Sequence, residues 1–72
     1  MKKLNEAERM IFDAAKDYLL CDKGELVFAP KEVYMARYEG LRDMALILGA
    51  TTQSDLEEII ERARKEAKEL IE

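Results

Sequence analysis

Residues 54–71 read SDLEEIIERARKEAKELI, and this stretch decides the fold. Its apolar residues recur at spacings of four, three, four and three, which is the period of one face of an α-helix. They are Leu56, Ile60, Ala63, Ala67 and Leu70, with Ile59 and Ile71 at the rim. Ser54 followed by Glu57 has the form of a capping box. Opposite charges four residues apart, such as Glu58 and Arg62, indicate a solvated outer face. The pattern predicts an amphipathic helix over about 54–71.

The same period occurs near the start of the chain. Its apolar positions there are Leu4, Ala7, Ile11, Ala14, Tyr18 and Cys21. Asn5 followed by Glu8 forms another capping box, and Gly24 suits a helix terminus because glycine tolerates the left-handed conformation. We therefore expect a second amphipathic helix over about 5–22.

A third helix is predicted over about 31–48. Its seam is formed by Tyr34, Tyr38, Leu41, Ala45 and Leu48, with Val33, Met44 and Ile47 beside it. Pro30 is favourable at the start, where a missing backbone donor costs nothing, and Gly49 stops the helix. Gly40 lies inside it at a cost of about 1 kcal/mol relative to alanine. We interpret Gly40 as the mark of a close helix crossing.

Residues 25–29 contain a short apolar run before Pro30, which predicts an extended connector, either a packed loop or one short strand. The fold class that follows is all-α, with residues 1–72 as a single small helical domain. Three such helices form either a helical hairpin or a small bundle. Because a chain of 72 residues buries little core by itself, we expect oligomerisation to complete it.

Composition excludes several classes of function. The chain has no histidine, and its lone cysteine, Cys21, falls in the apolar seam of the first helix, where we expect it to be a core residue. Neither a metal site, a cofactor nor an intramolecular disulfide is expected. The usual pairings of nucleophile and base are also missing, so we expect no enzymatic activity. The opening residues lack the apolar core of a signal peptide, and we expect a cytoplasmic protein.

The region after residue 44 resembles the turn of a helix-turn-helix protein. The stretch ALILGAT at 45–51 carries the small residues that a tight crossing needs. However, Leu56 lies seven positions after Gly49, where this family has an apolar residue at six. Asp55 and Glu57 at the start of the next helix, and a formal net charge of -4, would both repel phosphate. DNA binding is therefore the last of three functional hypotheses.

The second hypothesis concerns cationic and aromatic groups on adjoining faces of the helix over 31–48. These are Lys31, Tyr34, Arg37, Tyr38 and Arg42. Arginine binds phosphate in a fork and tyrosine stacks on a base, so a homo-oligomer could sequester an anionic nucleotide signalling molecule there. The alternative is structural: the tyrosines lie in the seam and the arginines pair with acids.

The leading hypothesis is a non-enzymatic interaction protein. Small acidic helical proteins of this kind resemble the accessory proteins of phages and mobile elements, many of which block a host protein or capture a signalling molecule. Three apolar seams on so short a chain favour a homodimer or larger assembly. Because no catalytic or metal site is recognisable, we expect the protein to bind and mask a partner protein, as an inhibitor would. We expect no membrane partner.

Overall fold

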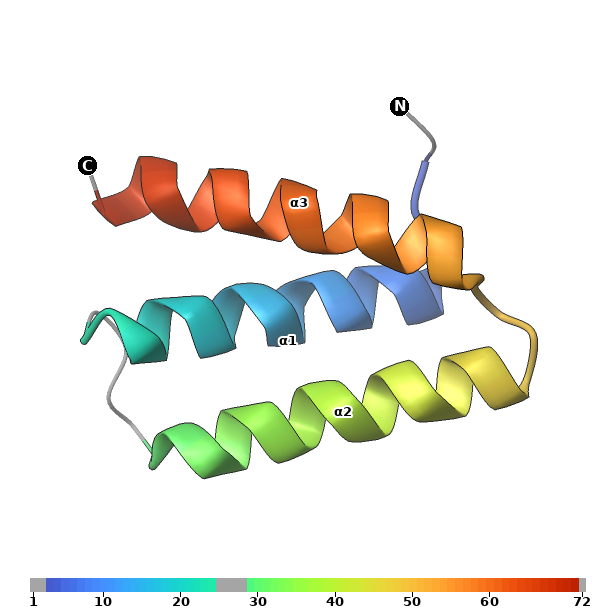
Figure 1. Ribbon diagram of the computed structural model, residues 1–72, viewed down its shortest axis with the longest axis horizontal. Coiled ribbons are helices and arrows are strands. Elements are labelled where there is room, and N and C mark those ends of the chain that lie inside the picture. Colours follow the sequence, from blue (N-terminus) through green and yellow to red (C-terminus); the bar gives the residue numbers. More distant parts are fainter. Residues whose placement is uncertain (1–2, 25–28, 72) are drawn as a thin grey trace.

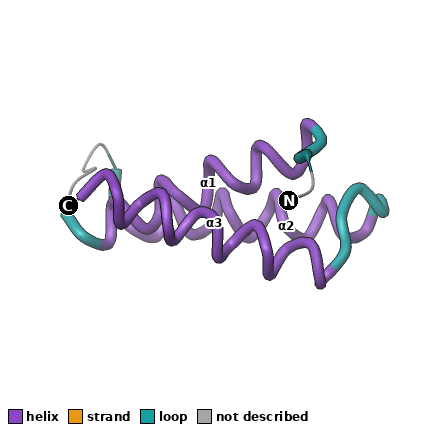
Figure 2. The backbone as a smooth tube through the Cα atoms, turned by 90° about the horizontal axis from the view of Figure 1, so that it is seen from above, coloured by secondary structure: helices purple, strands orange, loops and turns teal. Residues whose placement is uncertain are grey.

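The computed structural model describes residues 3–24 and 29–71, although not the side chain of Ile71. Within these residues it contains three helices, α1 (Glu6–Asp22), α2 (Lys31–Ile47) and α3 (Gln53–Ile71). α1 packs against both α2 and α3, and α1 and α3 run in the same direction while α2 runs opposite (Figure 1). All three lie along the long axis of a bundle measuring 33 × 25 × 16 Å (Figure 2). The predicted all-α class is confirmed, as a small bundle.

The helix boundaries follow local capping chemistry. Asn5 caps α1: its side-chain oxygen accepts from the backbone N–H of Glu8 at 2.8 Å, and Glu8 Oε1 accepts from the backbone N–H of Asn5 at 3.1 Å. This capping box was predicted. The one predicted at Ser54 was wrong, because α3 begins earlier. Thr52 Oγ1 accepts from the backbone N–H of Asp55 at 3.1 Å, which places the cap two residues before Ser54.

The predicted connector at 25–29 lies, except for Ala29, outside the described residues. Pro30 precedes the first turn of α2 with φ -59° and ψ 149°. A proline in this conformation directs the chain into the helix without giving up a backbone hydrogen bond.

The core forms mainly between α1 and α3. Its buried members are Ile11, Phe12 and Ala15 of α1, Leu56, Ile59 and Ala63 of α3, and Ala45 of α2. Burial of such apolar side chains is the main source of stability in a helical bundle. Since Ala45 is small, α2 is held mostly by half-buried neighbours, among them Tyr38 and Leu41. α2 is therefore the least enclosed of the three helices.

Two leucines predicted to lie in the seams are exposed instead. Leu48 is 72% exposed and Leu70 is 66% exposed. Both stand at the C-terminal end of their helices. Helical periodicity gives the direction of a side chain around the axis, but not the point along the axis where the neighbouring helix stops covering it.

Two smaller residues also differ from their predicted roles. Cys21 is half-buried rather than part of the core, and its Sγ lies 3.8 Å from the carbonyl oxygen of Ala29. Gly40 marks no helix crossing within the chain, because a Cβ placed there would meet nothing within 4 Å. Gly40 therefore has no packing role within the described residues.

A buried polar network ties the α2–α3 connection to the start of α1. Glu8 is fully buried, and its Oε2 accepts from the hydroxyl of Thr51 at 2.9 Å. Asn5 Nδ2 donates to the carbonyl oxygen of Ala50 at 2.8 Å. A carboxylate is buried at tolerable cost when hydrogen bonds replace its water. The network fixes where the chain turns between α2 and α3.

The glycines offer a matched pair of stability tests. Gly49 has φ +73°, a left-handed conformation that strains an L-residue, so Gly49→Ala is expected to lower the free energy of unfolding by about 1 kcal/mol. Gly40 is exposed inside a helix, so Gly40→Ala is expected to raise it by about 0.5–1 kcal/mol. Urea denaturation of dilute protein, followed by circular dichroism, measures both. Two changes of the same sign would contradict the prediction.

Candidate functional site

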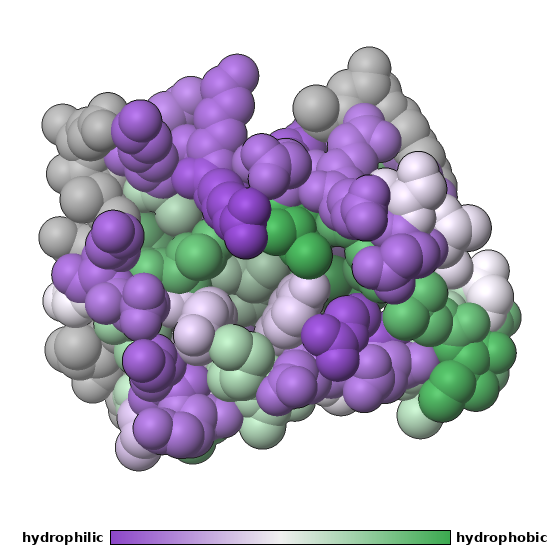
Figure 3. All heavy atoms as spheres, viewed as in Figure 1, coloured by the Kyte–Doolittle hydropathy of each residue, from purple (hydrophilic) through white to green (hydrophobic). Residues whose placement is uncertain are grey.

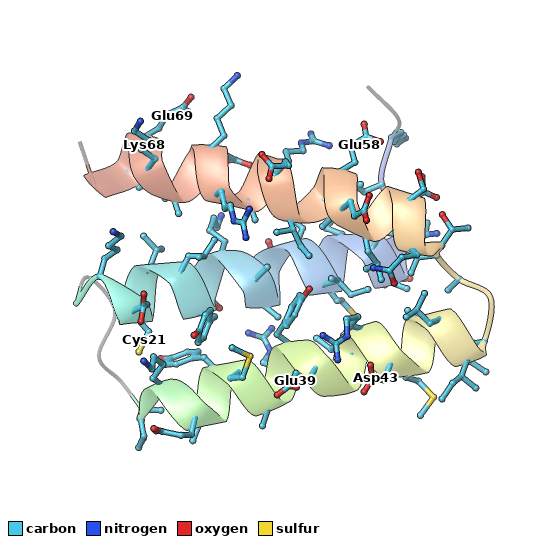
Figure 4. The ribbon with its side chains drawn as sticks, in the orientation of Figure 1. Cys21, Glu39, Asp43, Glu58, Lys68 and Glu69 are labelled. Carbon is cyan, nitrogen blue, oxygen red and sulfur yellow. The ribbon has the colours of Figure 1, made fainter. Side chains whose placement is uncertain are left out.

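The structure gives each cation of the predicted nucleotide site an acidic partner. Lys31 Nζ lies 3.3 Å from Asp22 Oδ1, and Arg37 Nη1 lies 3.1 Å from Asp17 Oδ2. The guanidinium of Arg42 is bound by two acids of its own helix: its Nε lies 3.0 Å from Asp43 Oδ1, and its Nη2 lies 4.0 Å from Glu39 Oε2. Figure 4 shows Glu39 and Asp43 next to each other along α2.

These pairs set the electrostatics of the predicted site. The hydrogen bond that Lys31 donates to Asp22, and then the negative charge of Asp22, raise the pKa of Lys31; the hydrogen bond that Arg42 donates to Asp43 raises the pKa of Arg42. The shifts keep both groups cationic, but each charge is already balanced by a carboxylate. A bound anion would have to displace these partners or lie beside them. The pairing therefore weakens the attraction of this surface for phosphate.

A groove runs between the helices on the face shown in Figure 3, where hydrophobic side chains lie between polar rims. One pocket in it, of about 170 Å³, is lined by Ala15, Tyr18, Leu19, Met35, Tyr38, Ile60 and Arg64. An adjacent pocket of about 340 Å³ shares Tyr18 and Met35 and includes Lys31. Of the five predicted residues, Tyr38 and Lys31 thus line neighbouring pockets, whereas Tyr34, Arg37 and Arg42 line neither of the two.

The most exposed apolar surface lies on the outward face of α2 and borders the second pocket, which Ala36 also lines. Val33, Ala36, Gly40, Met44 and Ile47 are all exposed, and their spacing of three, four, four and three places them on one face of the helix. We call these five residues the outer stripe. The exposed fractions are 54% for Val33, 56% for Met44 and 79% for Ile47. Figure 3 shows hydrophobic side chains gathered where α2 meets the α2–α3 connection.

Sequence reasoning missed the outer stripe. Val33, Met44 and Ile47 were assigned to the edge of the inward seam, because α2 carries apolar residues around most of its circumference. The spacing contained one usable signal: Val33, Gly40 and Ile47 are seven residues apart, which is a heptad repeat separate from that of the inward-facing tyrosines. Which face turns inward was settled by α1, which covers Ala45.

The helices that would form a helix-turn-helix do not cross tightly. α2 and α3 both pack against α1, which lies between them in Figure 1, and they run in opposite directions along the bundle. In DNA-binding helix-turn-helix units the two helices cross at roughly 90–120°. Glu58 and Glu69 also point away from the bundle on α3 (Figure 4). This geometry gives no support to a DNA-binding surface.

Other kinds of site find no support in the residues that the structure describes. Across 3–24 and 29–71, no group of three or more acidic or cysteine side chains is placed to hold a metal ion. No helix in that part of the chain is both long and apolar enough to cross a membrane. The sequence matches no protein-family model, and comparison with curated proteins and with solved structures finds no relative.

Proposed function

We propose that this protein is a non-enzymatic interaction protein that binds another protein chain through the outer stripe of α2 and so covers an apolar surface of that partner. The observation that supports the proposal is the exposure of Val33, Met44 and Ile47 along one helix face. Contiguous apolar surface on a small protein is characteristic of sites of protein association.

The position of the stripe strengthens the argument. Ala45 is the buried residue of α2 among the described residues, and Tyr38, Leu41 and Leu46 pack against the core from the same side, so the side chains of the outer stripe are not needed to hold the bundle together. A helix with an apolar outward face binds most readily to another helix or to an apolar groove, with anchors at successive turns. Ile47 and Met44 are the largest anchors on this face.

Site-specific photocrosslinking tests the proposal. A benzophenone amino acid at Ile47 is expected to form a covalent adduct of protein size in the cells that make this protein. The matched position is Glu69, which points away from the bundle on α3 (Figure 4) and should form none. Adding Met44→Glu to the Ile47 probe should reduce the adduct at least about tenfold, because a charge is then placed in the contact. Equal adducts at Ile47 and Glu69 would contradict the proposal.

The nucleotide alternative has one observation in its favour. The guanidinium of Arg42 lies over the ring of Tyr38, 5.5 Å from its centroid, so a cation and an aromatic ring are held together. If this surface sequesters an anionic nucleotide, native mass spectrometry of freshly purified protein will show an added mass of nucleotide size. Arg37→Ala and Arg42→Ala should each remove that mass without loss of helicity, and its retention by both variants would reject the alternative.

A further inference from the structure

We infer that the chain bound on the outer stripe is a second copy of this protein, with the two α2 helices packed antiparallel and crossing at Gly40. The inference rests on the proposed function, because it takes the same face as the binding surface and names its occupant.

The first argument is the symmetry of the stripe. Val33 and Ile47 each lie seven residues from Gly40, and Ala36 and Met44 each lie four residues from it. When two antiparallel helices are related by a two-fold axis at residue 40, Val33 of each copy lies level with Ile47 of the other. Ala36 of each copy likewise lies level with Met44 of the other copy. The small side chain of Ala36 then leaves room for the long side chain of Met44. The stripe is complementary to itself in this arrangement.

The second argument explains the glycine. Gly40 costs the helix about 1 kcal/mol, yet its Cβ position is open to solvent and its backbone is ordinary helix. A glycine at the centre of a helix pair lets the two backbones approach closely. If the partner is a second copy crossing at residue 40, the Gly40 residues of the two chains face each other, and neither has a side chain that would keep the backbones apart. The cost in the single chain is then offset by packing between chains.

The third argument is charge. Arg37 and Asp43 lie three residues before and three residues after Gly40, and both are exposed. Each already has a partner in its own chain, Asp17 at 3.1 Å and Arg42 at 3.0 Å, so a pair between copies would add to these contacts. The antiparallel arrangement places Arg37 of each copy level with Asp43 of the other, whereas a parallel one would place each charge level with its like. Opposite charges within about 10 Å attract measurably at ordinary ionic strength. The charges thus favour the antiparallel arrangement over the parallel one.

The contact is small, so the dimer is expected to be weak. α2 has 17 residues and spans about 25 Å, and a pair of such helices buries less than the roughly 1,200 Å² of a standard stable interface. Association should therefore be measured by sedimentation over about 1 µM to 1 mM. We expect a reversible monomer–dimer equilibrium in this range. A chain that stays monomeric throughout would overturn the inference.

Gly40→Leu and Ile47→Glu test the surface. Both positions are exposed in the single chain, so the helical spectrum should be unchanged, while the dimer dissociation constant rises at least about tenfold. Leu70→Glu is the control, because Leu70 is an exposed leucine on α3, away from the stripe, and should leave dimerisation unchanged. A dimer that tolerates both stripe variants would refute the assignment.

Engineered disulfides test the direction of pairing in a Cys21→Ser background. Val33→Cys combined with Ile47→Cys should crosslink two chains under mild oxidation, because the thiols of different copies lie level. Within one chain these positions are about 21 Å apart along the helix, too far for a disulfide. Ile47→Cys alone should not crosslink efficiently. Efficient crosslinking of the single variant would indicate parallel helices and overturn the antiparallel arrangement.

The photocrosslink at Ile47 separates this inference from the proposed function. An adduct with twice the mass of the chain supports both. If the adduct contains a different protein and the chain remains monomeric in sedimentation, the second copy is rejected as the occupant of the outer stripe. The proposed function would still stand in that case. No adduct and no dimer would reject both.

Discussion

Leu56→Ala is expected to lower the free energy of unfolding by about 2–5 kcal/mol, the largest effect of any change considered for this protein. Leu56 is fully buried at the start of α3, in the cluster that includes Ile11 and Ala45. Truncation removes apolar contacts and leaves a cavity that rigid helices can only partly close. A domain of this length has a total stability of roughly 4–11 kcal/mol, so the variant should lose a large part of its stability and unfold at a markedly lower temperature.

Leu70→Ala is the matched control for this experiment. It is the same substitution on the same helix, but Leu70 is 66% exposed, so the change in stability should stay within about 0.5 kcal/mol. Thermal unfolding followed by circular dichroism at 222 nm compares the two variants with the parent. Similar losses at Leu56 and Leu70 would mean that the core does not lie between α1 and α3 as described.

The second large effect is expected from Glu8→Ala, which should lower the free energy of unfolding by about 2–3 kcal/mol. The substitution removes the acceptor for the Thr51 hydroxyl and for the backbone N–H of Asn5. Those donors lose their partner, and a buried space opens between the start of α1 and the α2–α3 connection. Urea unfolding of the variant measures the loss.

Glu6→Ala provides the comparison. Glu6 lies in the same first turn of α1 and has the same charge, but its side chain is exposed. Its removal takes away a favourable interaction with the helix dipole of a few tenths of a kcal/mol. Thr51→Val should reproduce part of the Glu8 effect, since it deletes one hydrogen bond of the network. If Glu6→Ala and Glu8→Ala were equally destabilising, helix charge and not the buried network would explain the loss.

The chain order of apolar and capping residues was enough to predict the helices. Asn5 with Glu8, Pro30 and Gly49 act through backbone groups a few residues away, so their effect is visible in local sequence. The misplaced cap of α3 shows the limit of this reasoning. Thr52 and Ser54 are both good capping residues, and the one that caps is decided by where the preceding connection leaves the chain.

The surroundings of the candidate site residues could not be predicted from local sequence, for a different physical reason. The five residues of the nucleotide hypothesis are all on α2, but their cations pair with Asp17 and Asp22 of α1 and with acids of α2. The pairs with α1 join residues nine and twenty positions apart, so they exist only because α2 folds back along α1. Arg37 and Arg42 thus pair with acidic residues, as the structural alternative to the nucleotide hypothesis expects.

The sequence by itself determined that the chain forms three amphipathic helices, because periodicity, caps and helix stops are local properties of a polypeptide. The tertiary structure alone decided which faces are covered. α1 lies against both other helices and buries Ala45, which turns Val33, Gly40 and Ile47 outward. On a helix with apolar residues around most of its circumference, burial is decided by the helices that pack against it, and no local pattern contains that information.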